Sequence, residues 1–143
     1  MTYLSWFNEH GQKQKHIVDK LLSSGKSLNE IIDYFDFESM CENEPDFCPL
    51  YAEGKKCHDL ESLNCFLCSC PNFRFKDEGI DIINGKTRHS YCSIDSKDGA
   101  VGVYGDKIHQ DCSGCSVPHH KEYVKKHFHT NWFDIMKDSP LKS

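Results

Sequence analysis

The sequence contains no long apolar run and no excess of basic residues, and each absence excludes a class of function. None of its apolar stretches approaches the ~20 residues needed to cross a bilayer, so we expect no membrane insertion. The net charge is −5, whereas nucleic-acid binding needs a basic surface for its phosphate contacts, so we expect no nucleic-acid partner. The first ten residues also lack the basic start and apolar stretch of a signal peptide. We therefore predict a cytoplasmic protein.

The common catalytic motifs are missing as well. The sequence has no glycine-rich phosphate loop, no His-Glu-x-x-His helix and no clear Ser/His/Asp pattern. Cys68 or Cys115 could act as a redox-active thiol, because Cys-x-x-Cys turns lower thiol pKa values, but the βαβ context of a thioredoxin-like site is not apparent. The sequence thus favours a binding protein over an enzyme.

What the chain does contain is cysteine. All nine cysteines lie between Cys41 and Cys115, and neither flank has any. Cytosolic thiols are kept reduced, and an odd number does not favour complete disulfide pairing. Metal ligation is the better interpretation of this cluster.

The spacing of these cysteines is typical of metal sites. Cys65-x-x-Cys68 and Cys112-x-x-Cys115 form two Cys-x-x-Cys turns separated by a long loop, which is a zinc-ribbon-like pattern. Cys70 departs from that pattern. Residues two apart in an extended backbone point in opposite directions, so Cys68 and Cys70 fit one tetrahedral ion poorly. The pattern therefore predicts a polynuclear site or two neighbouring sites.

Eight of the cysteines can be divided into two groups of four ligands. The predicted ligands are Cys48, Cys57, Cys65, Cys68, Cys70, Cys92, Cys112 and Cys115. One division assigns Cys65, Cys68, Cys112 and Cys115 to one centre and Cys48, Cys57, Cys70 and Cys92 to the other, although other pairings satisfy the same geometry. Cys41 is then a spare thiol, and His58 and His119 are additional candidate ligands or donors to the ligands.

Two features favour iron–sulfur clusters over zinc. Cys48-Pro49 and Cys70-Pro71 are Cys-Pro dipeptides, which occur at iron–sulfur ligands, and aromatic residues surround them in the sequence. An apolar shell suits a cluster whose potential depends on burial. We expect one or two [4Fe–4S] clusters, with Zn²⁺ as the alternative because cytosolic Cys-x-x-Cys pairs near histidines most often bind zinc.

A family resemblance adds to this interpretation. It rests on four motifs: Cys57-His58, the block from Asn64 to Pro71 (Asn-Cys-Phe-Leu-Cys-Ser-Cys-Pro), Asp111-Cys-Ser-Gly-Cys115 and Pro118-His119. Over roughly residues 48–120, the chain resembles the prokaryotic cysteine-rich small domain. The resemblance implies a zinc-finger-like, metal-binding fold, and some members of that family accompany cobamide-assembly proteins. This chain departs from the family at Cys92, which is followed by Ser93 and Ile94 instead of two glycines.

The predicted fold is a small α+β, cysteine-rich, metal-stabilised domain with short strands and loops. Residues 1–40 should form an N-terminal helical hairpin, with a helix from Gln12 to Ser24, a stop at Gly25, and a second helix opened by the Ser27–Glu30 capping box and fading near Glu38. Residues 41–120 form the metal-binding domain, with short strands within 79–85, 89–94 and 99–105. Residues 121–143 form a C-terminal helix and tail packed on it, begun by Pro118.

We therefore expect a metal-binding protein that acts in electron transfer or redox sensing with a partner protein. The alternatives are a structural zinc module that serves as an interaction surface, and an accessory protein in cofactor assembly. The sequence leaves the oligomeric state open.

Overall fold

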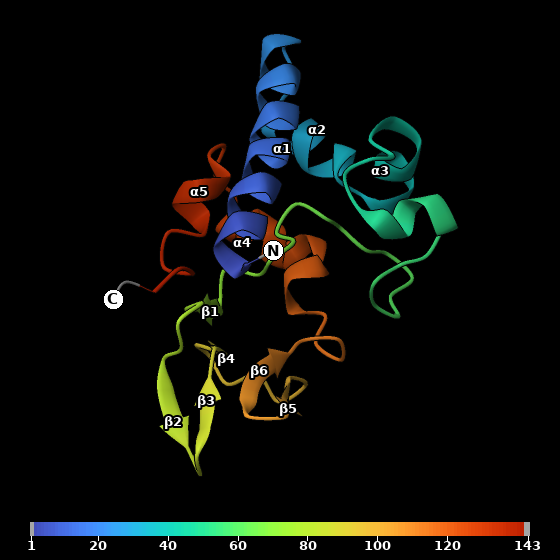
Figure 1. The fold of residues 1–143 in the computed structure, drawn as a ribbon. Coiled ribbons are helices and arrows are strands. Elements are labelled where there is room, and N and C mark those ends of the chain that lie inside the picture. Colours follow the sequence, from blue (N-terminus) through green and yellow to red (C-terminus); the bar gives the residue numbers. More distant parts are fainter. Residues whose placement is uncertain (1, 142–143) are drawn as a thin grey trace.

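The computed structural model describes residues 2–141, and Figure 1 shows helices in one half of the molecule and short strands in the other. The helices are α1 (Tyr3–Ser23), α2 (Leu28–Tyr34), α3 (Phe37–Asn43), α4 (Lys121–His127) and α5 (Trp132–Ile135), with 3₁₀ turns at Pro49–Glu53 and Val117–His119. The strands are β1 (Phe73–Phe75), β2 (Asp81–Ile83), β3 (Lys86–Arg88), β4 (Ser90–Cys92), β5 (Ala100–Tyr104) and β6 (Lys107–Asp111). The predicted small α+β class is confirmed.

Helix α1 begins nine residues earlier than predicted. The Thr2 side chain accepts a hydrogen bond from Ser5 N, and Ser5 Oγ accepts one from Thr2 N, each at 3.0 Å. This capping box starts the helix before its aromatic residues, so Tyr3 and Phe7 are helical. At the other end Gly25 has a φ of +78°, as expected of a glycine that stops a helix.

The second predicted helix is two helices. The Ser27–Glu30 capping box is present, with Ser27 N donating to Glu30 Oε1 at 3.0 Å and Glu30 N donating to Ser27 Oγ at 3.2 Å. Helix α2 then ends at Tyr34 instead of fading near Glu38, because Asp36 leaves the helix to form a β-bridge with Asn64. Helix α3 follows directly.

The strands form two small sheets. β1 pairs with β4 in an antiparallel ribbon, and the second sheet has the order β2-β3-β6-β5, in which only the β3–β6 pair is parallel. The three predicted strand regions contain β2, β4 and β5, whereas β1, β3 and β6 were not predicted. Cys92 ends β4 and Cys112 follows β6, so the sheets place these two thiols.

One hydrophobic core joins the helical half to the cysteine-rich segment. It includes Phe7 and Val18 of α1, Phe66 between two cysteines, and Trp132 and Met136 near the end of the chain. The single C-terminal helix that was predicted is two short helices, and Pro118 lies in the preceding 3₁₀ turn instead of opening the helix. Within the described residues, no helix is both long and apolar enough to cross a membrane.

Candidate metal centres and the adjoining cavity

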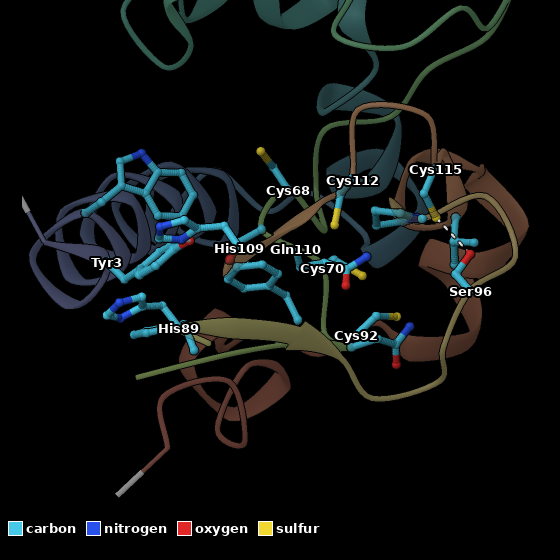
Figure 2. A pocket seen from close by; sticks show the side chains of 18 of the residues that line it. Tyr3, Cys68, Cys70, His89, Cys92, Ser96, His109, Gln110, Cys112 and Cys115 are labelled. Carbon is cyan, nitrogen blue, oxygen red and sulfur yellow. Dashed lines mark hydrogen bonds between the residues drawn. The ribbon is translucent and has the colours of Figure 1, made fainter. Parts of the chain in front are cut away.

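One group of four thiols surrounds a common space. This second thiol set consists of Cys70, Cys92, Cys112 and Cys115, and Figure 2 shows the four side chains around one opening. Burial raises the pKa of Cys112 to about 12, with smaller contributions from the neighbouring Cys70, Cys115 and Cys92. The Cys115 Sγ also lies 3.1 Å from Ser96 Oγ. The other three thiols are thus close enough to Cys112 to disfavour its ionisation.

The other four predicted ligands form a separate group. This first thiol set consists of Cys48, Cys57, Cys65 and Cys68. Burial raises the pKa of Cys68, and Cys65, Cys57 and Cys48 raise it further. Burial likewise raises the pKa of Cys65 to about 12, with smaller contributions from Cys57, Cys48 and Cys41. Cys41 is therefore a fifth thiol beside the first set.

This division differs from the partition predicted from the sequence. The prediction grouped the two Cys-x-x-Cys turns in one centre, but Figure 2 shows the Cys68 sulfur directed away from Cys70, Cys112 and Cys115. The difference is that Cys112 and Cys115 lie with Cys70 and Cys92, and that Cys48 and Cys57 lie with Cys65 and Cys68. Both divisions place Cys68 and Cys70 in different sets, and the backbone between them has positive φ values of +91° at Ser69 and +59° at Cys70.

A compact group of ligand atoms lies between the two sets. The ligand atoms of Cys57, His58 and His119 all lie within 4.8 Å of one another, and no other such trio occurs among residues 2–141. His58 Nδ1 is 3.0 Å and His119 Nε2 is 3.6 Å from Cys57 Sγ. His58 also donates from Nε2 to the Cys112 carbonyl at 3.0 Å, so its ring connects the two thiol sets.

Both histidines have a ring nitrogen free to bind a cation. His119 Nδ1 donates to the Asn64 carbonyl at 2.9 Å, which leaves the Nε2 lone pair directed toward Cys57. Burial lowers the pKa of His119 to about 4, so the ring is neutral at physiological pH. A neutral imidazole oriented by a carbonyl is the usual form of a histidine ligand.

Asn64 anchors the first Cys-x-x-Cys turn. Its side chain donates to the Ile32 carbonyl at 2.8 Å and accepts from Phe66 N at 2.9 Å. Its backbone N–H donates to the His119 carbonyl at 2.9 Å. Asn64 is 1% exposed and fully bonded, so it ties helix α2, the first Cys-x-x-Cys turn and His119 together.

Tyr51 is a further polar group at the first thiol set. Its hydroxyl is buried and makes no hydrogen bond of standard geometry within residues 2–141, but it lies beside Cys65. Burial raises the pKa of Tyr51, and the Cys65 thiol raises it further. A buried hydroxyl beside a ligand can donate to a thiolate sulfur once the metal has removed the thiol proton.

A cavity of about 880 Å³ extends from both thiol sets toward the start of α1. Its other lining residues include Tyr3 and Trp6 of α1, Phe73 of β1, and the histidines His89 and His109. No motif in the sequence marked the two histidines, because they come from separate segments. Figure 2 shows Tyr3, His89 and His109 at one end of the pocket and the second thiol set at the other.

Comparison with known proteins adds no relative. No family model, no curated protein and no solved structure matches this chain. The resemblance to the prokaryotic cysteine-rich small domain therefore stays a prediction, and the site must be interpreted from its own chemistry.

Proposed function

We propose that this protein binds two metal centres through eight cysteine thiolates, and that the centres are iron–sulfur clusters used in electron transfer or redox sensing with a partner protein in the cytoplasm. The observation that carries the proposal is the division of eight thiols into two sets of four. Thiolates are the ligands of iron–sulfur clusters, and four are needed for each.

The spacing of the sulfurs supports a cluster. Four thiolates around one zinc ion at Zn–S distances of ~2.3 Å have sulfurs ~3.8 Å apart. Within residues 2–141, no three cysteine sulfurs lie within 4.8 Å of one another. A cluster is larger than an ion and holds its four thiolates farther apart, so it fits these sets better.

The surroundings of the thiols also suit a redox centre. Phe66 and Leu67, between Cys65 and Cys68, are fully buried, and Cys65 and Cys115 are themselves buried. Exclusion of water in this way protects a cluster and tunes its potential. Cys57 is exposed, so the first set lies close enough to the surface for a partner protein to approach it.

Zinc is the second candidate, and the compact Cys57–His58–His119 group favours it. One thiol and two imidazoles within 4.8 Å form a donor set typical of zinc. A zinc ion there would compete with the first cluster for Cys57. The protein would then be a structural zinc module.

Anaerobic purification, an absorption spectrum, and analysis of iron, acid-labile sulfide and zinc test the proposal. We expect a brown protein with a broad band near ~400 nm and iron and sulfide in equal amounts. A colourless protein with stoichiometric zinc would overturn the iron–sulfur proposal and support the second candidate. A folded protein that holds neither metal after purification and reconstitution would overturn both.

A further inference from the structure

The end of the cavity away from the thiols has the character of a binding site for an organic molecule. We call it the aromatic end, and it is lined by Tyr3, Trp6, His89 and His109, with Phe73 between Tyr3 and Cys92. The Tyr3 ring lies 5.8 Å from the Phe73 ring, and the His89 and His109 rings stack at 5.2 Å with an interplanar angle of 14°. Apolar, aromatic walls with a few polar atoms are the usual lining of small-molecule sites.

A chain of hydrogen bonds fixes the tautomer of His109. The Gln110 N–H donates to Ser90 Oγ at 2.8 Å, and Ser90 is 2% exposed, so its own hydroxyl proton needs an acceptor. The neighbouring acceptor is the Tyr3 hydroxyl at 3.3 Å. Tyr3 must then donate its proton to His109 Nδ1. The neutral His109 ring therefore carries its proton on Nε2, which is a donor.

His89 has the opposite arrangement. Its Nδ1 lies 3.1 Å from the Asp77 carbonyl, which can only accept, so the proton of the neutral ring is on Nδ1. Its Nε2 is then an acceptor. Neither Nε2 has a hydrogen-bond partner within residues 2–141. The stacked pair thus offers one donor and one acceptor.

We propose that the aromatic end binds a planar heteroaromatic molecule with a lactam edge, that is, neighbouring C=O and N–H groups, as found in flavins, pterins and pyrimidine nucleobases. The C=O group accepts from His109 Nε2, and the N–H group donates to His89 Nε2. The ring packs against the aromatic walls. These walls favour a flat aromatic molecule, because aromatic pairs contribute more free energy than the burial of their surface alone. The proposal does not depend on which metal the thiols bind.

Isothermal titration calorimetry tests this inference. The anaerobically purified full-length protein is titrated with lumiflavin, lumazine and uracil. The three probes share the lactam edge and differ in having three, two or one rings. We expect saturable binding, with the ring number of the best ligand identifying the class. Absence of saturable binding for all three at concentrations up to about 1 mM would overturn the proposal, since a matched site should reach at least that affinity.

Two controls separate specific recognition from adsorption on the aromatic walls. 3-Methyllumiflavin keeps the ring system but lacks the lactam N–H, so we expect at least about tenfold weaker binding. His89→Leu and His109→Leu should each cause a similar loss, whereas His16→Leu, at an exposed histidine of α1 outside this cavity, should cause none. Equal affinities for methylated and unmethylated rings, or for the His89→Leu and unsubstituted proteins, would contradict the proposed contacts. Metal analysis of the same samples shows separately whether the centres are present.

Discussion

Cys68 and Cys70 are two residues apart, yet their sulfurs belong to different thiol sets. The intervening Ser69 has a φ of +91° and Cys70 one of +59°, which is uncommon for residues with a side chain. Backbone strain of this kind costs on the order of 1–3 kcal/mol per residue and persists where the surroundings enforce it. The short Cys-x-x-Cys-x-Cys segment therefore contributes thiols to both sets.

The first prediction tests the division of the thiols. In a Cys48→Ala/Cys92→Ala double variant, the structure places one lost ligand in each set, so we expect both centres to be lost. If Cys48 and Cys92 shared a centre, as the sequence alone suggested, the other centre would be retained. Metal content per chain measures the difference. The matched control is Cys41→Ala, which should keep the full metal content.

The second prediction concerns the packing of α1 against α5. A Cβ at Gly11 would lie 2.4 Å from Phe133 Cζ and 2.8 Å from Trp132 Cε3. Gly11→Ala should therefore lower the free energy of unfolding by about 1–3 kcal/mol, although alanine favours an isolated helix by about 1 kcal/mol. Urea unfolding measures this change. Gln12→Ala, at an exposed position of the same helix, should stay within about 0.5 kcal/mol, and a stabilised Gly11→Ala protein would refute the packing.

The third prediction is a pH dependence from His10. Burial, with a smaller contribution from Lys13, lowers the pKa of His10 from 6.5 to about 4, and its Nε2 has no hydrogen-bond partner within residues 2–141. Between these values the unfolded chain binds the proton and the folded chain does not. The contribution of His10 to the free energy of unfolding is therefore fully present above pH 6.5. It decreases as the pH falls toward 4, by up to about 3 kcal/mol.

His10→Phe isolates this contribution. Phenylalanine keeps a ring beside Trp6, which stacks on His10 at 4.8 Å, but cannot take up a proton. The difference in unfolding free energy between the two proteins should change between pH 6.5 and pH 4, while acid-induced metal loss affects both alike. A difference that is constant with pH would rule out a buried, neutral His10.

The fourth prediction concerns proton release on metal binding. Burial raises the pKa of both Cys65 and Cys112 to about 12, so these thiols carry protons at neutral pH before a metal binds. Ligation requires the thiolate, so metal binding should release protons and the apparent affinity should increase with pH. Calorimetry in two buffers of different ionisation enthalpy counts the protons released. Identical heats in both buffers would contradict thiol ligation.

Local features of the fold were accessible from the sequence, and long-range ones were not. The Ser27–Glu30 box and the stop at Gly25 depend on a few neighbouring residues, so they were predicted correctly. The parallel β3–β6 pairing joins Thr87 to Lys107, and the grouping of Cys112 and Cys115 with Cys70 and Cys92 depends on contacts between distant segments. Neither leaves a periodic pattern in the sequence. The pairing of His89 with His109 is likewise a product of the sheet. The placement of Cys68 and Cys70 in different groups, by contrast, was part of the predicted division.

The strand β1 is held by residues from much later in the chain. Phe75 N donates to the Ser139 carbonyl and the Phe75 carbonyl accepts from Leu141 N, each at 2.9 Å, while Phe73 pairs with Cys92. During synthesis on the ribosome, the support of β1 is therefore missing until residue 141 has emerged. We expect the second thiol set to acquire its final geometry, and the metal that we propose for it, only after translation of this segment is complete.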